Sequence, residues 1–214
     1  MKDFKKNIYR TASIPSIAPC DCASGEVAIG TQIWTCRNLD VVTYRNGDVI
    51  PQVTDPSQWV GLTTGAWCYY NNDVANNAVY GKLYNWYAVN DPRGLAPNGY
   101  HVPTYSEFLN TLLPYLATTY SADEGNVTKE VGTTHWNSDS GATNQTCFTA
   151  LPGGFRESNF GGSFYQINQY GYWWTSTENS ALYARGFSLR DTESYFSNPN
   201  NGKNFGQSVR LIKD

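Results

Sequence analysis

Five cysteines and two histidines are the residues of this 214-residue chain best suited to bind a metal or to act as nucleophiles. The cysteines are odd in number and unevenly spaced, so we expect no disulfide framework and at least one thiol that is unpaired unless it bridges two chains. Cys20 and Cys22 could bind a metal, but no second Cys or His pair lies nearby, and we predict no metal site. The other three are expected to be small buried hydrophobic residues: Cys36, Cys68 and Cys147.

The remaining titratable residues do not point to catalysis. His101 precedes a predicted helix, and we expect it to be partly buried and hydrogen-bonded, fixing the loop that enters that helix. His135 lies in a polar loop without an evident partner. Three glutamates could form the carboxylate pair of a glycoside hydrolase, although nothing in the sequence fixes their separation: Glu157, Glu178 and Glu193. We therefore predict no catalytic residue, no enzyme activity and no cofactor.

The composition favours a binding protein over several other classes. Aromatic and charged residues each make up 15% of the chain. Because so few residues are charged, Asn, Ser, Thr, Gly and Tyr must make up much of the surface, as they do in adaptable binding surfaces. The same composition is common in secreted or virion β-rich proteins. A net charge of −3 gives no basic stripe for nucleic acid, and no stretch approaches the roughly 18 apolar residues of a membrane span. The first residues also lack the apolar segment of a secretory signal.

The order of segments predicts an α+β chain with an extended N-terminal arm over 1–24 and one domain over 25–214. The arm has no usable periodicity and could dock on a partner. Alternating apolar residues on either side of Gly30-Thr31 predict a hairpin, and turn signals over 43–66 predict a long irregular loop that carries Trp59 inward.

Two helices are predicted, followed by a β-rich half. Helical spacing of Leu83, Trp86 and Tyr87 predicts a helix over 80–89 with a buried face. A capping box of Thr104 and Glu107 begins the second helix, and Pro114 is expected to bend its last turn. After about residue 120, short strands joined by glycine turns replace the helical pattern.

Eight short motifs, in this order, resemble the Fibrobacter succinogenes major paralogous domain family over about residues 26–213. The resemblance implies a C-type-lectin-like fold, with two helices packed on short antiparallel sheets, shared with formylglycine-generating enzymes and with the variable proteins of diversity-generating retroelements. Ala96 replaces the family's usual cysteine, and Cys147 stands where glycine is more common. The motifs are Ile29-Gly-Thr-Gln-Ile-Trp34, Asn38-Leu39, Ala66-Trp-Cys-Tyr-Tyr-Asn-Asn-Asp73, Tyr80-Gly-x-Leu-Tyr-Asn-Trp-Tyr-Ala88, Gly99-Tyr-His-Val-Pro-Thr104, Ala150-Leu-Pro-Gly-Gly154, Gly171-Tyr-Trp-Trp-x-Ser-Thr177 and Gly206-x-Ser-Val-Arg210.

Two activities of related folds find little support. An oxidase of the formylglycine-generating type would need a reactive cysteine pair near its C-terminal strands, and no cysteine follows Cys147. The calcium-binding sugar motifs of lectins are absent, and the oxygen-rich segments Asn71-Asn-Asp73 and Asn198-Pro-Asn-Asn201 are more typical of turns.

The stretch from Glu178 to Phe205 is the predicted ligand-binding region. Of its 28 positions, 13 are Asn, Ser, Tyr, Asp or Thr, and they interrupt packing residues such as Trp173 and Val209. Rigid support beneath adaptable contacts suits recognition. In the retroelement-diversified proteins that the family resembles, mutagenesis at adenines produces this same residue mixture. The alternative to a ligand-binding region is a solvated edge of the domain that binds no ligand. The candidate contacts are Asn179, Tyr183, Arg185, Ser188, Arg190, Asp191, Tyr195, Asn198 and Asn201.

We therefore expect a ligand-binding or adhesion module that recognises a host-surface protein or glycan. The alternatives are a structural virion or cell-surface decoration protein and, more distantly, an oxidase. The arm and the lack of a signal segment favour a virion location, on a phage tail or capsid, over a bacterial cell surface or secretion. Other virion or surface proteins would then contact the arm, and a homo-oligomer, a trimer by analogy with tail proteins, would fit.

Overall fold

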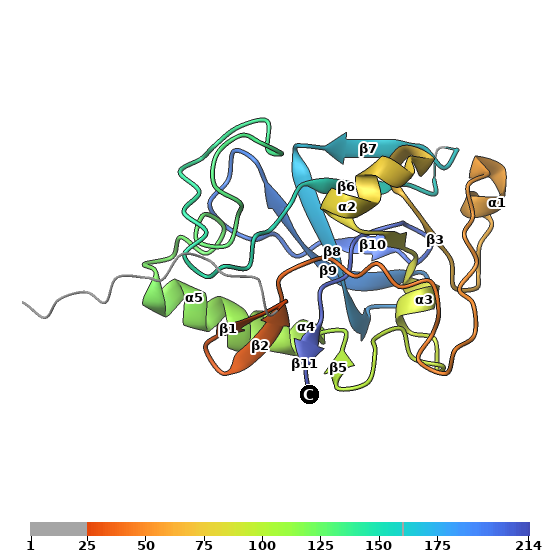
Figure 1. The fold of residues 1–214 in the computed structure, drawn as a ribbon, viewed down its shortest axis with the longest axis horizontal. Coiled ribbons are helices and arrows are strands. Elements are labelled where there is room, and N and C mark those ends of the chain that lie inside the picture. The colour runs from red at the N-terminus through yellow and green to blue at the C-terminus, as the bar shows by residue number, and fades with distance from the viewer. Residues whose placement is uncertain (1–24, 160) are drawn as a thin grey trace, which may run out of the picture.

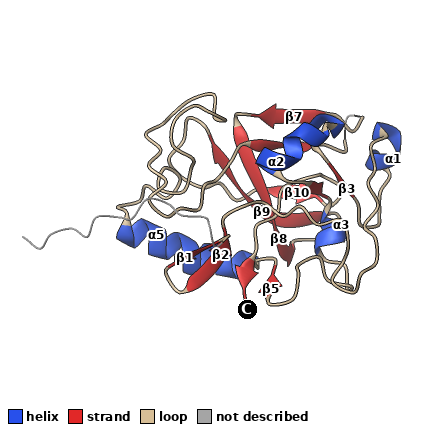
Figure 2. Ribbon diagram, viewed as in Figure 1, coloured by secondary structure: helices blue, strands red, loops and turns tan. Residues whose placement is uncertain are grey.

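The computed structural model describes residues 25–159 and 161–214 and shows a mixed α+β domain. Its two main helical segments lie over 70–80, in three short pieces, and over 105–119. The second segment and the strand-rich C-terminal half are as expected. Helices lie around the outside and the longest strands cross the middle (Figure 2). The predicted arm, with Cys20 and Cys22, lies outside the described residues.

The first and last strands of the domain meet in one sheet. β1 (Glu26–Ile29) and β2 (Gln32–Thr35) form the predicted hairpin around Gly30, whose φ of 62° suits glycine. The short C-terminal strand β11 (Ile212–Lys213) pairs antiparallel with both β2 and β5 (Tyr100–His101), which gives the order β1-β2-β11-β5. The two ends of the domain therefore hold each other in place (Figure 1).

A five-stranded sheet forms the centre of the C-terminal half, in the order β10-β9-β8-β6-β7. All its pairs are antiparallel except β6 with β8, and β8 shifts register against β9 between Trp174 and Glu178. β10 is an edge strand beside the start of β9. The strands are β6 (Gly153–Arg156), β7 (Phe164–Ile167), β8 (Tyr170–Glu178), β9 (Tyr183–Arg190) and β10 (Asn200–Gly202).

The longest helical segment begins as the sequence predicts. Thr104 accepts from the Glu107 amide, and the Glu107 carboxylate accepts from the Thr104 amide, which completes the capping box. Pro114, which donates no backbone hydrogen bond, follows a π-helical turn in the middle of the segment, so its effect lies there and not in the last turn. The parts are α4 (Tyr105–Glu107), η4 (Phe108–Leu112) and α5 (Leu113–Thr119).

The predicted helix over 80–89 is wrong. Gly81 adopts φ 69° and ψ −151°, and a Cβ there would lie 2.9 Å from the Leu39 carbonyl, so the chain leaves the helix at this residue. A two-stranded sheet follows, and then Asn85 caps a single helical turn by accepting from the Ala88 amide. The segments before and after this break are β3 (Trp67–Cys68), η2 (Tyr70–Asn72), η3 (Val74–Asn76), α2 (Asn77–Tyr80), β4 (Leu83–Tyr84) and α3 (Trp86–Val89).

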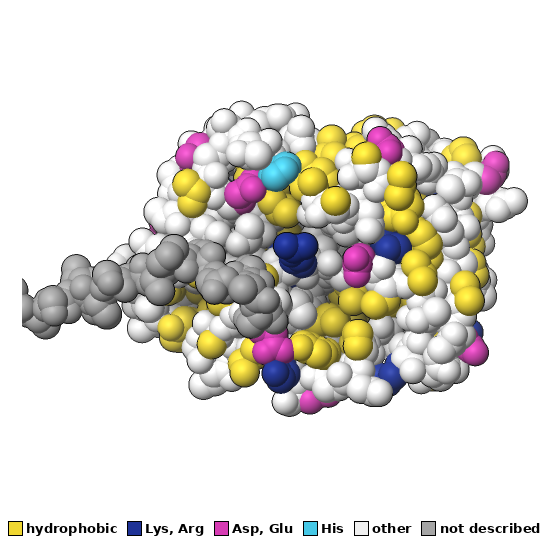
Figure 3. All heavy atoms as spheres, in the orientation of Figure 1, with side chains coloured by type: hydrophobic (Ala, Val, Ile, Leu, Met, Phe, Trp, Pro, Cys, Tyr) yellow, Lys and Arg dark blue, Asp and Glu magenta, His cyan; other side chains and the backbone are white. Residues whose placement is uncertain are grey.

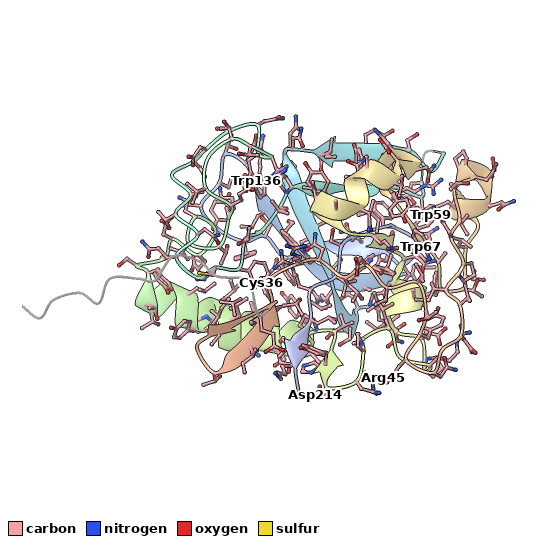
Figure 4. All side chains as sticks on the ribbon, viewed as in Figure 1. Cys36, Arg45, Trp59, Trp67, Trp136 and Asp214 are labelled. Carbon is pink, nitrogen blue, oxygen red and sulfur yellow. The ribbon has the colours of Figure 1, made fainter. Side chains whose placement is uncertain are left out.

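Aromatic side chains fill the core. The rings of Phe108 and Phe187 stack at 4.4 Å, which holds the long helix against β9, and Phe187 also stacks on Trp173 at 5.4 Å. Trp59 is fully buried, as predicted, from the short helix α1 (Pro56–Val60). Trp136 packs at the opposite end of the molecule from Trp59 (Figure 4).

Two of the cysteine predictions are also wrong. Cys36 and Cys147 are disulfide-bonded, so they are not simply small hydrophobic residues, and sequence spacing failed to show this because such bonds depend on the folded geometry. Cys68 is a free buried thiol, as expected. Burial raises the pKa of Cys68 to about 12, which keeps its thiol protonated at neutral pH.

Candidate functional site

The nine predicted contact residues divide into three sets along β9. An extended strand of this length spans roughly 23 Å, so a single small ligand would not reach both ends. The first set lies at or next to the start of β9, the second beside its middle, and the third at its last residue and in the loop that follows: Asn179, Tyr183 and Asn201; Arg185, Ser188 and Asn198; Arg190, Asp191 and Tyr195.

The middle set is occupied by contacts within the protein. The Arg185 guanidinium lies 5.0 Å from the ring of Tyr105, and the Asn198 amide donates to the Tyr105 hydroxyl at 2.9 Å. Ser188 is buried and its backbone pairs with Ser197. Other segments cover both faces of β9 at this point, so Ser188 is not available as a surface contact.

The third set is held by a buried lysine. The Lys129 ammonium donates to the carbonyl oxygens of Arg190, Asp191 and Glu193 at 3.3, 3.3 and 2.7 Å. Burial lowers the pKa of Lys129, although nearby carboxylates oppose this effect. Asp191 is itself buried and so is not a surface contact either, whereas Tyr195 is 53% exposed. This loop offers one exposed ring on a rigid support.

Of the first set, Tyr183 lines a hollow of about 280 Å³, which we call the hairpin hollow, whereas Asn179 and Asn201 are not among its lining residues. Tyr183, 47% exposed, and Leu182, 70% exposed, project from the turn between β8 and β9 and form one wall. None of the described residues that line the hollow is charged. Besides these two, the lining residues are Val60, Gly61, Leu62, Thr63, Tyr87, Asn159, Gly202 and Asn204.

Buried contacts fix the walls of the hairpin hollow. The Asn204 side chain donates to the Val60 carbonyl at 2.9 Å and accepts from the Ser158 hydroxyl at 2.6 Å. These bonds tie the segment after β10 to the end of α1 and to the segment after β6. The turn of the hairpin closes through the amide of Asn179, which donates to the Tyr183 carbonyl at 3.0 Å. The hollow is thus preformed, with its exposed rings carried on rigid elements.

A buried lysine, Lys203, stabilises the turn between β8 and β9. The Lys203 ammonium pairs with Glu178 at the end of β8 and lies 4.9 Å from the ring of Trp86. The backbone amide of Lys203 also donates to the Leu182 carbonyl at 3.0 Å. Lys203 is 7% exposed, so its charge supports the wall and is not presented to a ligand.

Tyr87, Leu62 and Leu182 are site residues that the sequence did not reveal. Helical spacing assigned Tyr87 to a buried face, but the one-turn helix α3 leaves it half-buried at the hollow. Leu62 comes from the irregular loop, whose path no periodicity predicts. The available signal was the pair Leu182-Tyr183, two large apolar residues within a polar stretch.

The other titratable groups have structural partners. His101 lies between Glu107 and Asp214, with nitrogen-to-oxygen distances of 3.0 and 2.8 Å, and fixes the entry to the helix as predicted. Burial lowers the pKa of His101, but its hydrogen bonds to both carboxylates outweigh burial and raise the pKa above 6.5. His135 pairs with Glu130 at 2.9 Å.

The three glutamates considered for catalysis are engaged separately. The Glu157 carboxylate accepts from the backbone amide of Gly162, Glu178 pairs with Lys203, and Glu193 pairs with the Arg190 guanidinium. Each carboxylate therefore stabilises a loop or a turn.

Residues 25–159 and 161–214 contain no group of three His, Cys, Asp or Glu side chains that could hold a metal ion. Within the same ranges, no helix has the length and apolar character needed to cross a membrane. On the face shown in Figure 3, charged side chains are scattered among apolar and uncharged ones and form no basic patch.

These features define an α+β domain with a preformed, uncharged surface hollow beside its central sheet. The chain belongs to the Fibrobacter succinogenes major domain family, whose model matches residues 27–213. Searches of curated proteins and of solved structures find no match.

Proposed function

We propose that this domain is a non-catalytic ligand-binding module with a C-type-lectin-like fold, and that the hairpin hollow is its contact surface. The fold proposal is supported by two helices beside short sheets and by the β-rich C-terminal half. The observation that carries the function is the exposure of Leu182 and Tyr183 above a fixed wall. Large, rigid rings on a preorganised support bind at low entropic cost.

The ligand is a component of a host surface or of another extracellular surface. The disulfides of Cys36 and Cys147 support an oxidising environment, since such bonds persist mainly outside the cytosol. Location on a phage particle and diversification by a retroelement stay predictions from the sequence.

Binding of the fluorescently labelled chain to intact bacterial cells of several species tests this function. Tyr183→Ala is expected to weaken binding about tenfold or more, as at a binding hot spot. Tyr195→Ala is the matched control, because it removes an equally exposed ring at the other end of β9. Both variants should unfold within about 3 °C of the parent, since neither ring is buried. Equal binding by the parent and Tyr183→Ala would refute the site.

A further inference from the structure

A second hollow of about 230 Å³ adjoins the hairpin hollow. The two share Thr63 and Tyr87, so together they form one groove that passes Tyr183, then Tyr87, and ends at Asp91 and Arg93. Joined, they reach the range of about 300–1,000 Å³ that is typical of ligand sites. The groove has room for more than one small ring along its length.

The groove presents polar groups that the protein does not use. Among the described residues, the side chains of Thr63, Asn90 and Asn159 and the hydroxyls of Tyr87 and Tyr183 have no hydrogen-bond partner. Side-chain amides elsewhere in the domain form hydrogen bonds within the protein. The side-chain oxygen of Asn85, for example, accepts from the Ala66 amide, and its nitrogen donates to the Thr64 carbonyl. The groove therefore offers neutral donors and acceptors to a ligand.

Charge in the groove is balanced within the protein. The Arg93 guanidinium binds Asp91 through two nitrogens, at 2.8 and 2.9 Å, and reaches Asp48 at 3.3 Å. Asp91 and Arg93 are the only charged residues of the described lining, and both belong to the second hollow. An anionic ligand would find no free cation here, and a cationic ligand no free carboxylate.

Resting on the proposed function, we infer that the groove binds a neutral, linear oligosaccharide. Its apolar C–H faces would pack on the rings of Tyr183 and Tyr87, and its hydroxyls would bond with Thr63, Asn90 and Asn159. A sugar ring has the required combination of an apolar face and a polar edge. A peptide could also bond these neutral groups through its backbone donors and acceptors, so periodate oxidation and protease treatment of the cells are used to separate the two ligand classes.

The probes are cellohexaose, laminarihexaose, mannohexaose and chitohexaose, each titrated calorimetrically and printed on an array of neutral glycans. We expect at least one to bind. Thr63→Asp places a carboxylate at the junction of the two hollows and should weaken binding about tenfold or more. Thr31→Asp, at a position that is also exposed, in the turn of the first hairpin, should bind like the parent. Tyr87→Phe should retain more affinity than Tyr87→Ala, because it keeps the ring.

Two outcomes would overturn the inference. One is the absence of binding to every neutral glycan on the array at millimolar concentration. The other is cell binding that survives periodate oxidation of surface glycans but is lost after protease treatment, which would indicate a polypeptide ligand. In either case, loss of cell binding in Tyr183→Ala would leave the proposed function standing, whereas parent-like cell binding by that variant would refute the function itself.

Discussion

Asn38 is the side chain whose replacement should most clearly separate fold from function. Its amide nitrogen donates to the Tyr80 carbonyl at 2.9 Å and to the Ser208 hydroxyl at 3.3 Å. Its oxygen accepts from the Trp173 indole at 2.9 Å and from the Arg210 guanidinium at 2.8 Å. All five residues belong to the family motifs, and they meet at this one amide.

Replacing Asn38 with Ala leaves buried groups without partners. The indole N–H of Trp173 and one N–H of the fully buried Arg210 lose their acceptor, and the Tyr80 carbonyl loses a donor. Each unsatisfied buried group costs about 1–3 kcal/mol, so we expect the free energy of unfolding to fall by about 3–5 kcal/mol. In a chain of this length, that loss lowers the unfolding temperature by about 6–20 °C.

Urea and thermal unfolding of Asn38→Ala measure this loss. Asn46→Ala is the matched control, because its amide bonds only Asp48 in an exposed turn, and it should cost less than about 1 kcal/mol. If Asn38→Ala unfolds like Asn46→Ala, the motif residues do not stabilise the fold through this network and the reasoning is wrong.

Two further predictions concern buried and paired charges. Lys129→Met should lower the free energy of unfolding by about 3–5 kcal/mol, because three carbonyls lose their donor. It should also speed amide hydrogen exchange over 190–195, and unchanged exchange there would contradict this role of Lys129. The raised pKa of His101 means that protonation stabilises the fold, so its contribution is complete below about pH 6.5 and is lost as the pH rises through the folded pKa. The difference in unfolding temperature between the parent and His101→Gln should therefore shrink from pH 6 to pH 9, and a constant difference would contradict the pairing with Glu107 and Asp214.

Sequence predicted the features that depend on neighbouring residues. The hairpin around Gly30 and the capping box of Thr104 and Glu107 were found because each signal lies within a few residues. The helix over 80–89 was misassigned because the chain leaves the helix at Gly81 and the Lys82 amide donates to the Leu39 carbonyl at 3.2 Å, a contact between distant segments. The disulfides of Cys36 and Cys147 were missed for the same kind of reason.

Composition placed the candidate contacts in the stretch from Glu178 to Phe205, but it could not tell which of these side chains are exposed. Alternation along β9 cannot say which positions other segments cover, and those segments bury Ser188 and Asp191. Conversely, Tyr87 and Leu62 reach the hairpin hollow from segments far from residues 178–205. A site assembled from five separate segments leaves no single pattern in the sequence.

The family motifs and the candidate contacts also differ in how freely they can vary. A Cβ at Gly171 would lie 2.7 Å from the Leu151 carbonyl, and Trp173 is fully buried, so substitution at either position forces the backbone or core to move. Leu182 and Tyr183 are exposed at a turn, where a new side chain displaces only water. The walls of the hollow can therefore change while the Asn38 network is kept. The family motifs thus account for the fold of this domain, whereas its ligand has to be inferred from the residues at these turn and loop positions.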